Sequence, residues 1–260
     1  MPFLEGLLLR FCLKPEVVES AGSPESTRPP LALLLDVYPE FLDRIRGKRV
    51  LDFGCGPGTQ SVALAVAGAG RVVGVDINPL ALGEGRRSAE RHDVSGRVKF
   101  VQALEPNPKE TFDVVFSQNS MEHFSDPGAI LRTMAAALAP DGEILVTFGP
   151  PWFAPYGAHM RYFTNLPWVH LLFPERTIMA VRTRYRHDGA ARYEDVEGGL
   201  NRMSVRKFRR LVQTSGLRLT WLKTEPVKGQ RILSKLPFLG ELFTNHVTAL
   251  LRKATELPSP

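Results

Sequence analysis

Short apolar runs alternate with amphipathic stretches between residues 49 and 149. Five runs are rich in Val, Ile, Leu and Phe, so they predict buried strands. They are RVLDF (49–53), RVVGVD (71–76), VKFVQA (98–103), FDVVFSQ (112–118) and GEILVTFG (142–149). The stretches 58–70, 79–93 and 126–142 between them predict helices. Strands that alternate with helices imply right-handed crossovers and a mainly parallel sheet that is covered on both faces.

The regions on either side of this alternation follow other patterns. Apolar residues at helical spacing predict a helix over 4–11, and a second helical stretch spans 31–48 with an interruption near Pro39. Prolines and small polar residues between them predict a linker over 15–30. Residues 150–200 are rich in Pro, aromatic residues and His, so we interpret them as an insertion instead of a sheet element.

The C-terminal part returns to regular elements. A helix is predicted over 204–216, with Ser204 as its N-cap and Gly216 as its end. Two strands are predicted over 217–227 and 245–253.

Composition and charge narrow the class of protein. The 260 residues are 43% hydrophobic and 23% charged, which is typical of a folded globular chain. The formal net charge of +6 favours a basic surface over a dedicated nucleic-acid binder. Only Cys12 and Cys55 are present, so neither a disulfide framework nor a cysteine metal cluster is expected. The same cysteine usage favours a reducing compartment, so we expect a cytoplasmic protein, and no apolar run reaches the roughly 18 residues of a membrane span.

The loop after the first predicted strand, LDFGCGPGTQ (51–60), carries the chemistry. A phosphate-binding P-loop needs Lys followed by Ser or Thr after its last glycine, and this loop has no lysine. A dinucleotide-binding loop has the spacing G-x-G-x-x-G, which would place its third glycine at Thr59. Instead, the glycines stand at alternate positions after Asp52. Glycines allow the backbone to approach a ligand closely, and an acidic residue suits a cationic one.

This pattern resembles the first motif of class I S-adenosylmethionine-dependent methyltransferases. The resemblance extends to GVDINP (74–79), to SMEHF (120–124) and to LAPDGEILVT (138–147), and it covers about residues 47–149 with looser agreement over 200–252. It implies an α/β fold: a Rossmann-like, doubly wound, seven-stranded and mostly parallel sheet with an antiparallel last strand and an inserted lid.

The resemblance also gives the expected division of the chain. The parts are an N-terminal helical region (1–46), a cofactor-binding core (47–149), a lid or acceptor-binding insertion (150–200), the C-terminal part of the core (201–253) and a tail (254–260).

The resemblance implies S-adenosyl-L-methionine as cofactor and a set of residues around it. Asp76 would accept hydrogen bonds from the ribose hydroxyls, although it would suit an NAD ribose as well. This sequence departs from the family in having no acidic residue directly after the third strand, so the backbone of Ala103 and Leu104 is the expected adenine contact. The full expected set is Asp52, Gly54, Cys55, Gly56, Gly58, Gln60, Asp76, Ile77, Ala103, Leu104, Gln118 and Asn119.

Two histidines are the candidates for acid–base chemistry. His123 lies in the turn after the fourth strand, and His159 lies in the insertion. A histidine titrates in the range that suits removal of a proton from a hydroxyl acceptor. No metal cluster is expected. The expected acceptor-binding residues are Trp152, Tyr156, His159, Arg161 and Tyr162.

The sequence therefore predicts a methyltransferase that acts on a small, apolar or aromatic acceptor, with O-methylation as the preferred reaction. The alternatives are an NAD(P)-dependent oxidoreductase and an RNA or other nucleic-acid methyltransferase. The basic runs 182–187 and 206–210 are candidates for binding an anionic substrate, with a solvated face as the alternative explanation. The N-terminal apolar stretch and segment 231–243 are candidates for peripheral membrane contact or for a dimer interface. The acceptor's identity and the oligomeric state do not follow from the sequence.

Overall fold

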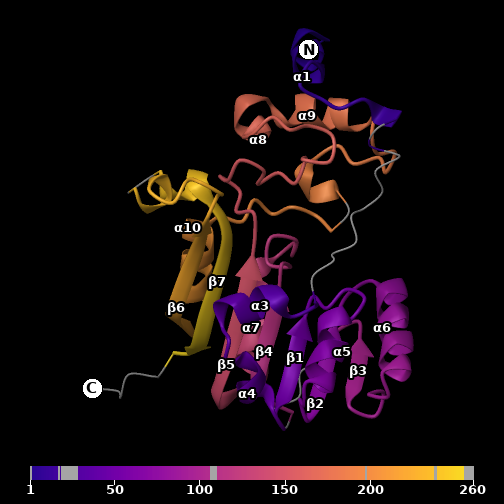
Figure 1. The fold of residues 1–260 in the computed structure, drawn as a ribbon, viewed down its shortest axis with the longest axis vertical. Coiled ribbons are helices and arrows are strands. Elements are labelled where there is room, and N and C mark those ends of the chain that lie inside the picture. The colour runs from indigo at the N-terminus through magenta and orange to yellow at the C-terminus, as the bar shows by residue number, and fades with distance from the viewer. Residues whose placement is uncertain are drawn as a thin grey trace.

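A seven-stranded sheet forms the centre of the protein (Figure 1). The structure is a computed structural model that describes residues 2–16, 18, 29–105, 110–196, 198–236 and 239–254. The strands are β1 (Arg49–Phe53), β2 (Arg71–Val75), β3 (Val98–Val101), β4 (Phe112–Gln118), β5 (Leu138–Phe148), β6 (Leu217–Pro226) and β7 (Thr244–Lys253). Their order is β3-β2-β1-β4-β5-β7-β6, and β7 runs antiparallel to both neighbours. The predicted mostly parallel sheet with an antiparallel last strand is therefore confirmed.

Helices cover both faces of this sheet and create two apolar cores. One core lies under α3 (Ala32–Val37), α4 (Phe41–Ile45), α5 (Thr59–Val66) and α6 (Pro79–Arg91). The other core lies under α7 (Pro127–Ala137) and α10 (Val205–Gln213). Two short 3₁₀ helices, η2 (Leu233–Lys235) and η3 (Gly240–Phe243), lie between β6 and β7.

Alternation along the central strands explains why both faces are apolar. Val50 is paired with Val72, and both lie in the core under α5, whereas the next residue, Leu51, lies in the opposite core. Because side chains alternate between faces, a strand buried on both sides must be apolar throughout. Uninterrupted runs such as RVLDF are the result.

The helix predicted over 126–142 is shorter than expected. Asp126 caps α7 by accepting a hydrogen bond from the Ala129 N–H at 2.9 Å, but the helix ends at Ala137. Leu138 instead pairs with Phe112 of β4, so β5 begins four residues earlier than its predicted start. Pro140 cannot continue a helix, which favours the extended conformation.

A separate layer lies beyond the carboxyl ends of the parallel strands (Figure 1). It contains α8 (Val169–Leu172), α9 (Glu175–Arg182) and the 3₁₀ helix η1 (Tyr193–Asp195), around a third apolar core. The N-terminal helix α1 (Pro2–Leu9) belongs to this layer, since Leu8 lies in the same core as Phe163. The structure thus divides the predicted region 1–46 between two layers. Most of the predicted linker, residues 19–28, lies outside the described residues.

Two further features of the described residues bear on the sequence-based expectations. Their helices include none with the length and apolar character needed to span a membrane. In the basic run 182–187, Arg182 is buried and its guanidinium pairs with Asp188 at 2.5 Å. Arg182 is therefore occupied by a partner within the same segment.

Candidate functional site

The three glycines of the loop after β1 serve different purposes. A Cβ on Gly58 would lie 2.4 Å from the Phe100 ring, and one on Gly54 would lie 2.7 Å from the Ser120 side chain. Both glycines are therefore required for close packing of the loop against its neighbours. Gly56 has a φ of 51°, and a Cβ there would meet nothing within 4 Å. Gly56 is the glycine of this loop that faces open space.

Asp76 organises the loop from the end of the neighbouring strand β2. Its Oδ2 accepts a hydrogen bond from the Gly56 N–H at 2.8 Å, and its Oδ1 accepts one from the Asn78 N–H at 2.9 Å. The Gly56 N–H is thus already committed to a carboxylate, whereas a phosphate site needs free N–H groups. Each carboxylate oxygen keeps a second lone pair for a hydroxyl donor. The neighbouring Ile77 is 87% exposed and offers an apolar surface to a flat ring.

Asp52 is buried beneath the loop. Its side chain is 2% exposed and accepts a hydrogen bond from the Ser61 hydroxyl of α5 at 2.6 Å. Burial raises the pKa of Asp52 to about 7, the Ser61 bond opposes the rise, and Asp76 raises it further. Two carboxyl groups that repel each other beside the loop favour a cationic ligand over a phosphate. The residues present therefore fit a cationic nucleoside such as S-adenosyl-L-methionine.

The other predicted cofactor residues lie in or near this loop and differ in how exposed they are. The thiol of Cys55 is buried, and burial raises its pKa. Gln60 is partly exposed in the first turn of α5. Ala103 is exposed after β3, whereas Leu104 packs against the core under α7. These residues follow β1 and β3, and the carboxyl ends of these two strands lie at the same edge of the sheet.

Two of the predicted residues end strand β4. Gln118 has a buried Oε1 without a hydrogen-bond partner among the described residues. Asn119 has a φ of 49°, and its Oδ1 accepts a hydrogen bond from the His246 ring at 3.0 Å. Asn119 is therefore held by a residue of β7, which the sequence pattern does not indicate.

The structure brings the two candidate histidines together. The rings of His123 and His159 lie edge to face, with centroids 5.3 Å apart. The Nδ1 of His123 lies 2.7 Å from the Gly199 carbonyl oxygen. A carbonyl only accepts, so Nδ1 carries the proton and Nε2 of the neutral ring has a free lone pair. Burial lowers the pKa of His159 to about 4, with a further lowering from His123. His159 is therefore neutral near pH 7.

The predicted acceptor-binding residues do not form a single group. Trp152 packs edge to face on His170 and on Tyr193, with centroids 4.6 and 5.0 Å apart. Arg161 lies over the Tyr156 ring at 4.9 Å, so these two residues contact each other.

Tyr162 packs against Phe163, and it lies beside the core that contains α9. Of the five predicted acceptor-binding residues, His159 therefore lies directly against His123.

Sequence reasoning missed several polar residues beside this histidine pair. Glu122 is 3% exposed, and its Oε1 accepts a hydrogen bond from the Gly149 N–H at 3.0 Å. Burial raises the pKa of Glu122. Asn201 and Arg202, which were also missed, line a cavity with His123 and with Lys207 of the predicted basic run 206–210. The SMEH motif contains Glu122, but nothing in the sequence connects that motif with residues eighty positions later.

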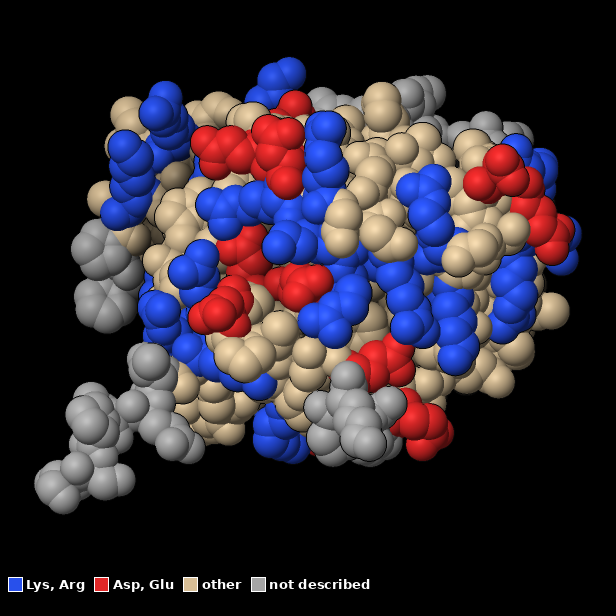
Figure 2. Space-filling view, turned by 90° about the horizontal axis from the view of Figure 1, so that it is seen from below, with Lys and Arg blue, Asp and Glu red and all other residues tan. Residues whose placement is uncertain are grey.

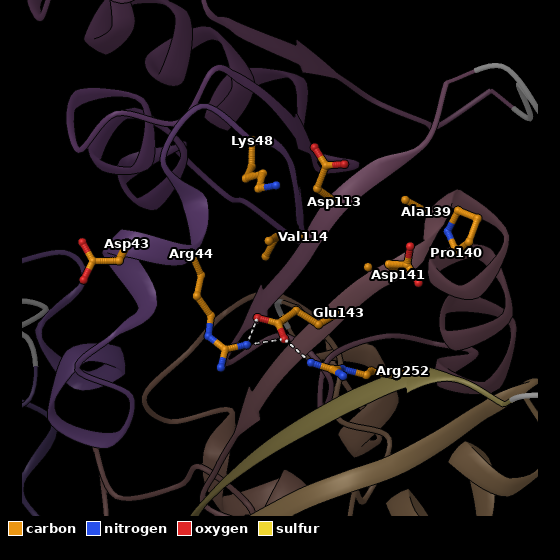
Figure 3. Close-up of a pocket in the computed structure, with 11 residues that line it drawn as sticks. Asp43, Arg44, Lys48, Asp113, Val114, Ala139, Pro140, Asp141, Glu143 and Arg252 are labelled. Atoms are coloured by element: carbon orange, nitrogen blue, oxygen red, sulfur yellow. Dashed lines mark hydrogen bonds and ion pairs between the residues drawn. The ribbon is translucent and has the colours of Figure 1, made fainter.

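A second cavity lies at the opposite edge of the sheet. It has a volume of about 520 Å³, and basic side chains gather on the face that contains it (Figure 2). Arg44 and Arg252 both contact the buried Glu143, at 2.7 and 3.4 Å (Figure 3). These ion pairs join α4, β5 and β7. The network lies away from the carboxyl ends of the parallel strands, where ligands of doubly wound sheets bind.

Comparison with known proteins decides the family. A family model described as a methyltransferase domain matches residues 27–221. The chain belongs to this methyltransferase domain family. Among solved structures, this methyltransferase domain resembles an S-adenosylmethionine-dependent methyltransferase from Mesorhizobium loti, with 18% identity, a TM-score of 0.57, and coverage of 84% of this chain and 96% of that one. The predicted family and fold are therefore confirmed.

Curated relatives are more similar in sequence. The methyltransferase domain is 38% identical over 123 residues to the ubiquinone biosynthesis O-methyltransferase of Neisseria meningitidis serogroup C (strain 053442). The matched region covers 43% of this chain and 50% of that protein. It is 36% identical over 131 residues to the enzyme of the same name from Actinobacillus pleuropneumoniae serotype 5b (strain L20). Here the matched region covers 46% of this chain and 56% of that protein. The chain thus spans about half the length of the curated relatives it matches.

The fold alone does not define the reaction. The methyltransferase domain also resembles the [4+2]-cyclase SpnF, with 16% identity, a TM-score of 0.59, and coverage of 90% of this chain and 84% of that one. Since one fold supports different chemistry, the function must be argued from the residues of the site.

Proposed function

We propose that this chain is an S-adenosyl-L-methionine-dependent O-methyltransferase for a small hydroxylated acceptor, with His123 as the general base. The observation that carries the proposal is the arrangement of Gly56 and Asp76. Gly56 presents an open face, and its N–H is bound by a carboxylate that can still accept hydroxyl hydrogen bonds. This arrangement suits a ribose and disfavours a pyrophosphate. The names of the curated relatives support O-methylation.

The cofactor site would be formed by groups at the carboxyl ends of β1 and β2. Asp76 would bind the ribose, the backbone at Gly56 would lie beside the ligand, and Ile77 would cover the adenine. Asp52 would add negative potential from below the loop without direct contact, because it is 2% exposed and bonded to Ser61. When bound, S-adenosyl-L-methionine supplies a methyl group on a cationic sulfur.

The remaining task for the chain is to align the acceptor and to remove its proton. Correct alignment of reactants supplies a large part of the rate enhancement in such displacements. The Gly199 carbonyl holds His123 with Nε2 free, so this nitrogen can take the proton of an acceptor hydroxyl. His159 is a weaker base because its pKa is about 4. We therefore assign proton removal to His123 and the orientation of its ring to His159.

Calorimetric titration with S-adenosylhomocysteine tests the cofactor assignment. We expect Asp76→Ala to weaken binding by about 10- to 100-fold, because it removes two charge-assisted hydrogen bonds to the ribose. Asp141→Ala, an exposed aspartate at the opposite edge of the sheet, is the matched control and should bind like the wild type. Binding of NADH in preference to S-adenosylhomocysteine would contradict the assignment.

A methyl-transfer assay with catechol tests the base. In His123→Asn, the amide can still donate to the Gly199 carbonyl, but no proton acceptor replaces Nε2. We expect kcat to fall by at least about 100-fold, whereas His159→Gln should lower it by less than about tenfold. The reverse ranking of the two variants would assign the base to His159.

A further inference from the structure

A cavity of about 460 Å³ lies where residues 199–202 meet the turn after β4. One wall consists of His123 and Phe124, and the opposite wall is formed by residues 199–202. Lys207, from the first turn of α10, also lines the cavity, as do Ser125 and Glu194. The cavity therefore includes the histidine to which we assign proton removal.

Hydrogen bonds hold these walls together. The Asn201 N–H donates to the Glu122 carbonyl at 2.9 Å, and the Asn201 side-chain amide donates to the Met121 and Phe124 carbonyls at 2.8 Å each. The contact between His123 and Gly199 adds a fourth bond. A lining fixed in this way is organised before a ligand arrives, which reduces the entropy that binding must overcome.

The charges of this cavity are not balanced. The Lys207 ammonium donates to the Asn201 carbonyl, and within the described part of the chain it has no carboxylate partner. Arg202 stacks over the Trp152 ring at 5.4 Å, and its charge is paired with Glu175 at 2.7 Å, so the charge without an ion-pair partner in this lining is that of Lys207. Glu194 also lines the cavity, but its carboxylate pairs with Arg192 at 2.7 Å. Burial lowers the pKa of Lys207, and Arg202 lowers it further. By contrast, the two arginines of the cavity at the opposite edge, Arg44 and Arg252, are both paired with Glu143.

Phe124 separates this cavity from the glycine loop. Its ring stands edge to face on Phe53 at 5.9 Å, and a Cβ on Gly54 would come within 3.2 Å of it. A ligand in the cavity would therefore lie one side chain away from the proposed cofactor site and in contact with His123.

We propose that this cavity binds a carboxylate or phosphate group of the methyl acceptor through Lys207 and Arg202, and so places the acceptor hydroxyl at His123. The inference rests on the proposed function and adds the acceptor's chemical class. Arg202 is held in place by its stack on Trp152 and by a 2.7 Å ion pair with Glu175, so it presents a preorganised guanidinium. Charge-assisted hydrogen bonds from two cations would fix the orientation of the acceptor.

The test compares two acceptors that differ by one carboxylate, 3,4-dihydroxybenzoate and catechol, with formation of S-adenosylhomocysteine as the readout. For the wild type, we expect the KM of the carboxylated acceptor to be lower by about tenfold or more. Lys207→Gln keeps a donor for the Asn201 carbonyl but loses the charge, and it should abolish this difference. Lys207→Arg should restore it. Arg209→Gln, on the exposed face of the same helix, is the control and should leave both KM values unchanged.

Three results would overturn the inference. One is an equal KM for both acceptors in the wild type. Another is an equal change for both acceptors in Lys207→Gln. The third is a loss of S-adenosylhomocysteine affinity in that variant, which would assign the cavity to the cofactor's own carboxylate.

Direct calorimetry with 3,4-dihydroxybenzoate separates this inference from the proposed function. Binding that is weakened in Lys207→Gln and restored in Lys207→Arg supports the cavity even if no methyl transfer occurs. Methyl transfer to both acceptors without that weakening would support the function alone.

Discussion

Replacing Asp52 by Asn removes a carboxyl group that is buried without a cationic partner among the described residues. Its pKa rises from an ordinary 3.8 to about 7 in the folded protein, and burial is the main cause. A raised pKa in an acid means that the folded state favours the protonated form. The carboxyl group therefore destabilises the fold increasingly as the pH rises from about 4 to about 7, and it has no such effect below about pH 4.

The size of this effect follows from the shift. Each pKa unit corresponds to about 1.4 kcal/mol, so the shift destabilises the fold by about 4 kcal/mol at pH 8 and by about 2 kcal/mol at pH 5. The shift already includes the effect of the Ser61 hydrogen bond, which Asn can still accept. We expect Asp52→Asn to raise the free energy of unfolding by about 4 kcal/mol at pH 8 and by about 2 kcal/mol at pH 5.

Urea denaturation of the wild type and the variant at these two pH values is the assay. Asp113→Asn provides a control with the opposite sign, because a hydrogen bond from Arg49 lowers the pKa of Asp113, so its loss should destabilise the protein at pH 8. A difference between wild type and Asp52→Asn that does not change with pH would refute the reasoning. We also expect the variant to keep its affinity for S-adenosylhomocysteine within about tenfold, since Asp52 is buried against Ser61.

Two further predictions concern the loop and the histidine pair. Gly58→Ala should lower the free energy of unfolding by at least about 2 kcal/mol because its Cβ would clash with Phe100 at 2.4 Å, whereas Gly56→Ala should cost about 1 kcal/mol of backbone strain and mainly weaken S-adenosylhomocysteine binding. Urea denaturation and calorimetry on the same two samples distinguish these effects, and equal losses of stability would argue against the open face at Gly56. The buried His159, with a pKa lowered from 6.5 to about 4, makes the fold lose stability as the pH falls through that range, so His159→Gln should reduce this loss in denaturation measurements. An unchanged acid dependence would show that His159 stays solvated.

Much of the core could be predicted from local patterns. The runs at 49–53 and 112–118 are strands with the predicted bounds, because a buried parallel strand is apolar along its whole length and ends where polar or glycine residues begin. The proximity of the glycine loop to Asp76 also followed from sequence, since adjacent parallel strands end at the same edge of a sheet. The end of α7 at Ala137 did not, because the pairing of Leu138 with Phe112 outweighs helix propensity.

Local patterns were enough to predict the alternation of strands and helices over 49–149, the alternate glycines after Asp52 and the acidic residue after β2. These features depend on residues that are close in the chain or at the ends of neighbouring strands. The fold was needed to place Leu8 in the third core with Phe163, His123 against His159, and Lys207 beside residues 199–202 and the turn after β4. Such contacts depend on the path of the chain between β5 and α10, which contains α8, α9 and η1. That path is decided by packing and by hydrogen bonds such as those of Asn201, which periodicity does not encode.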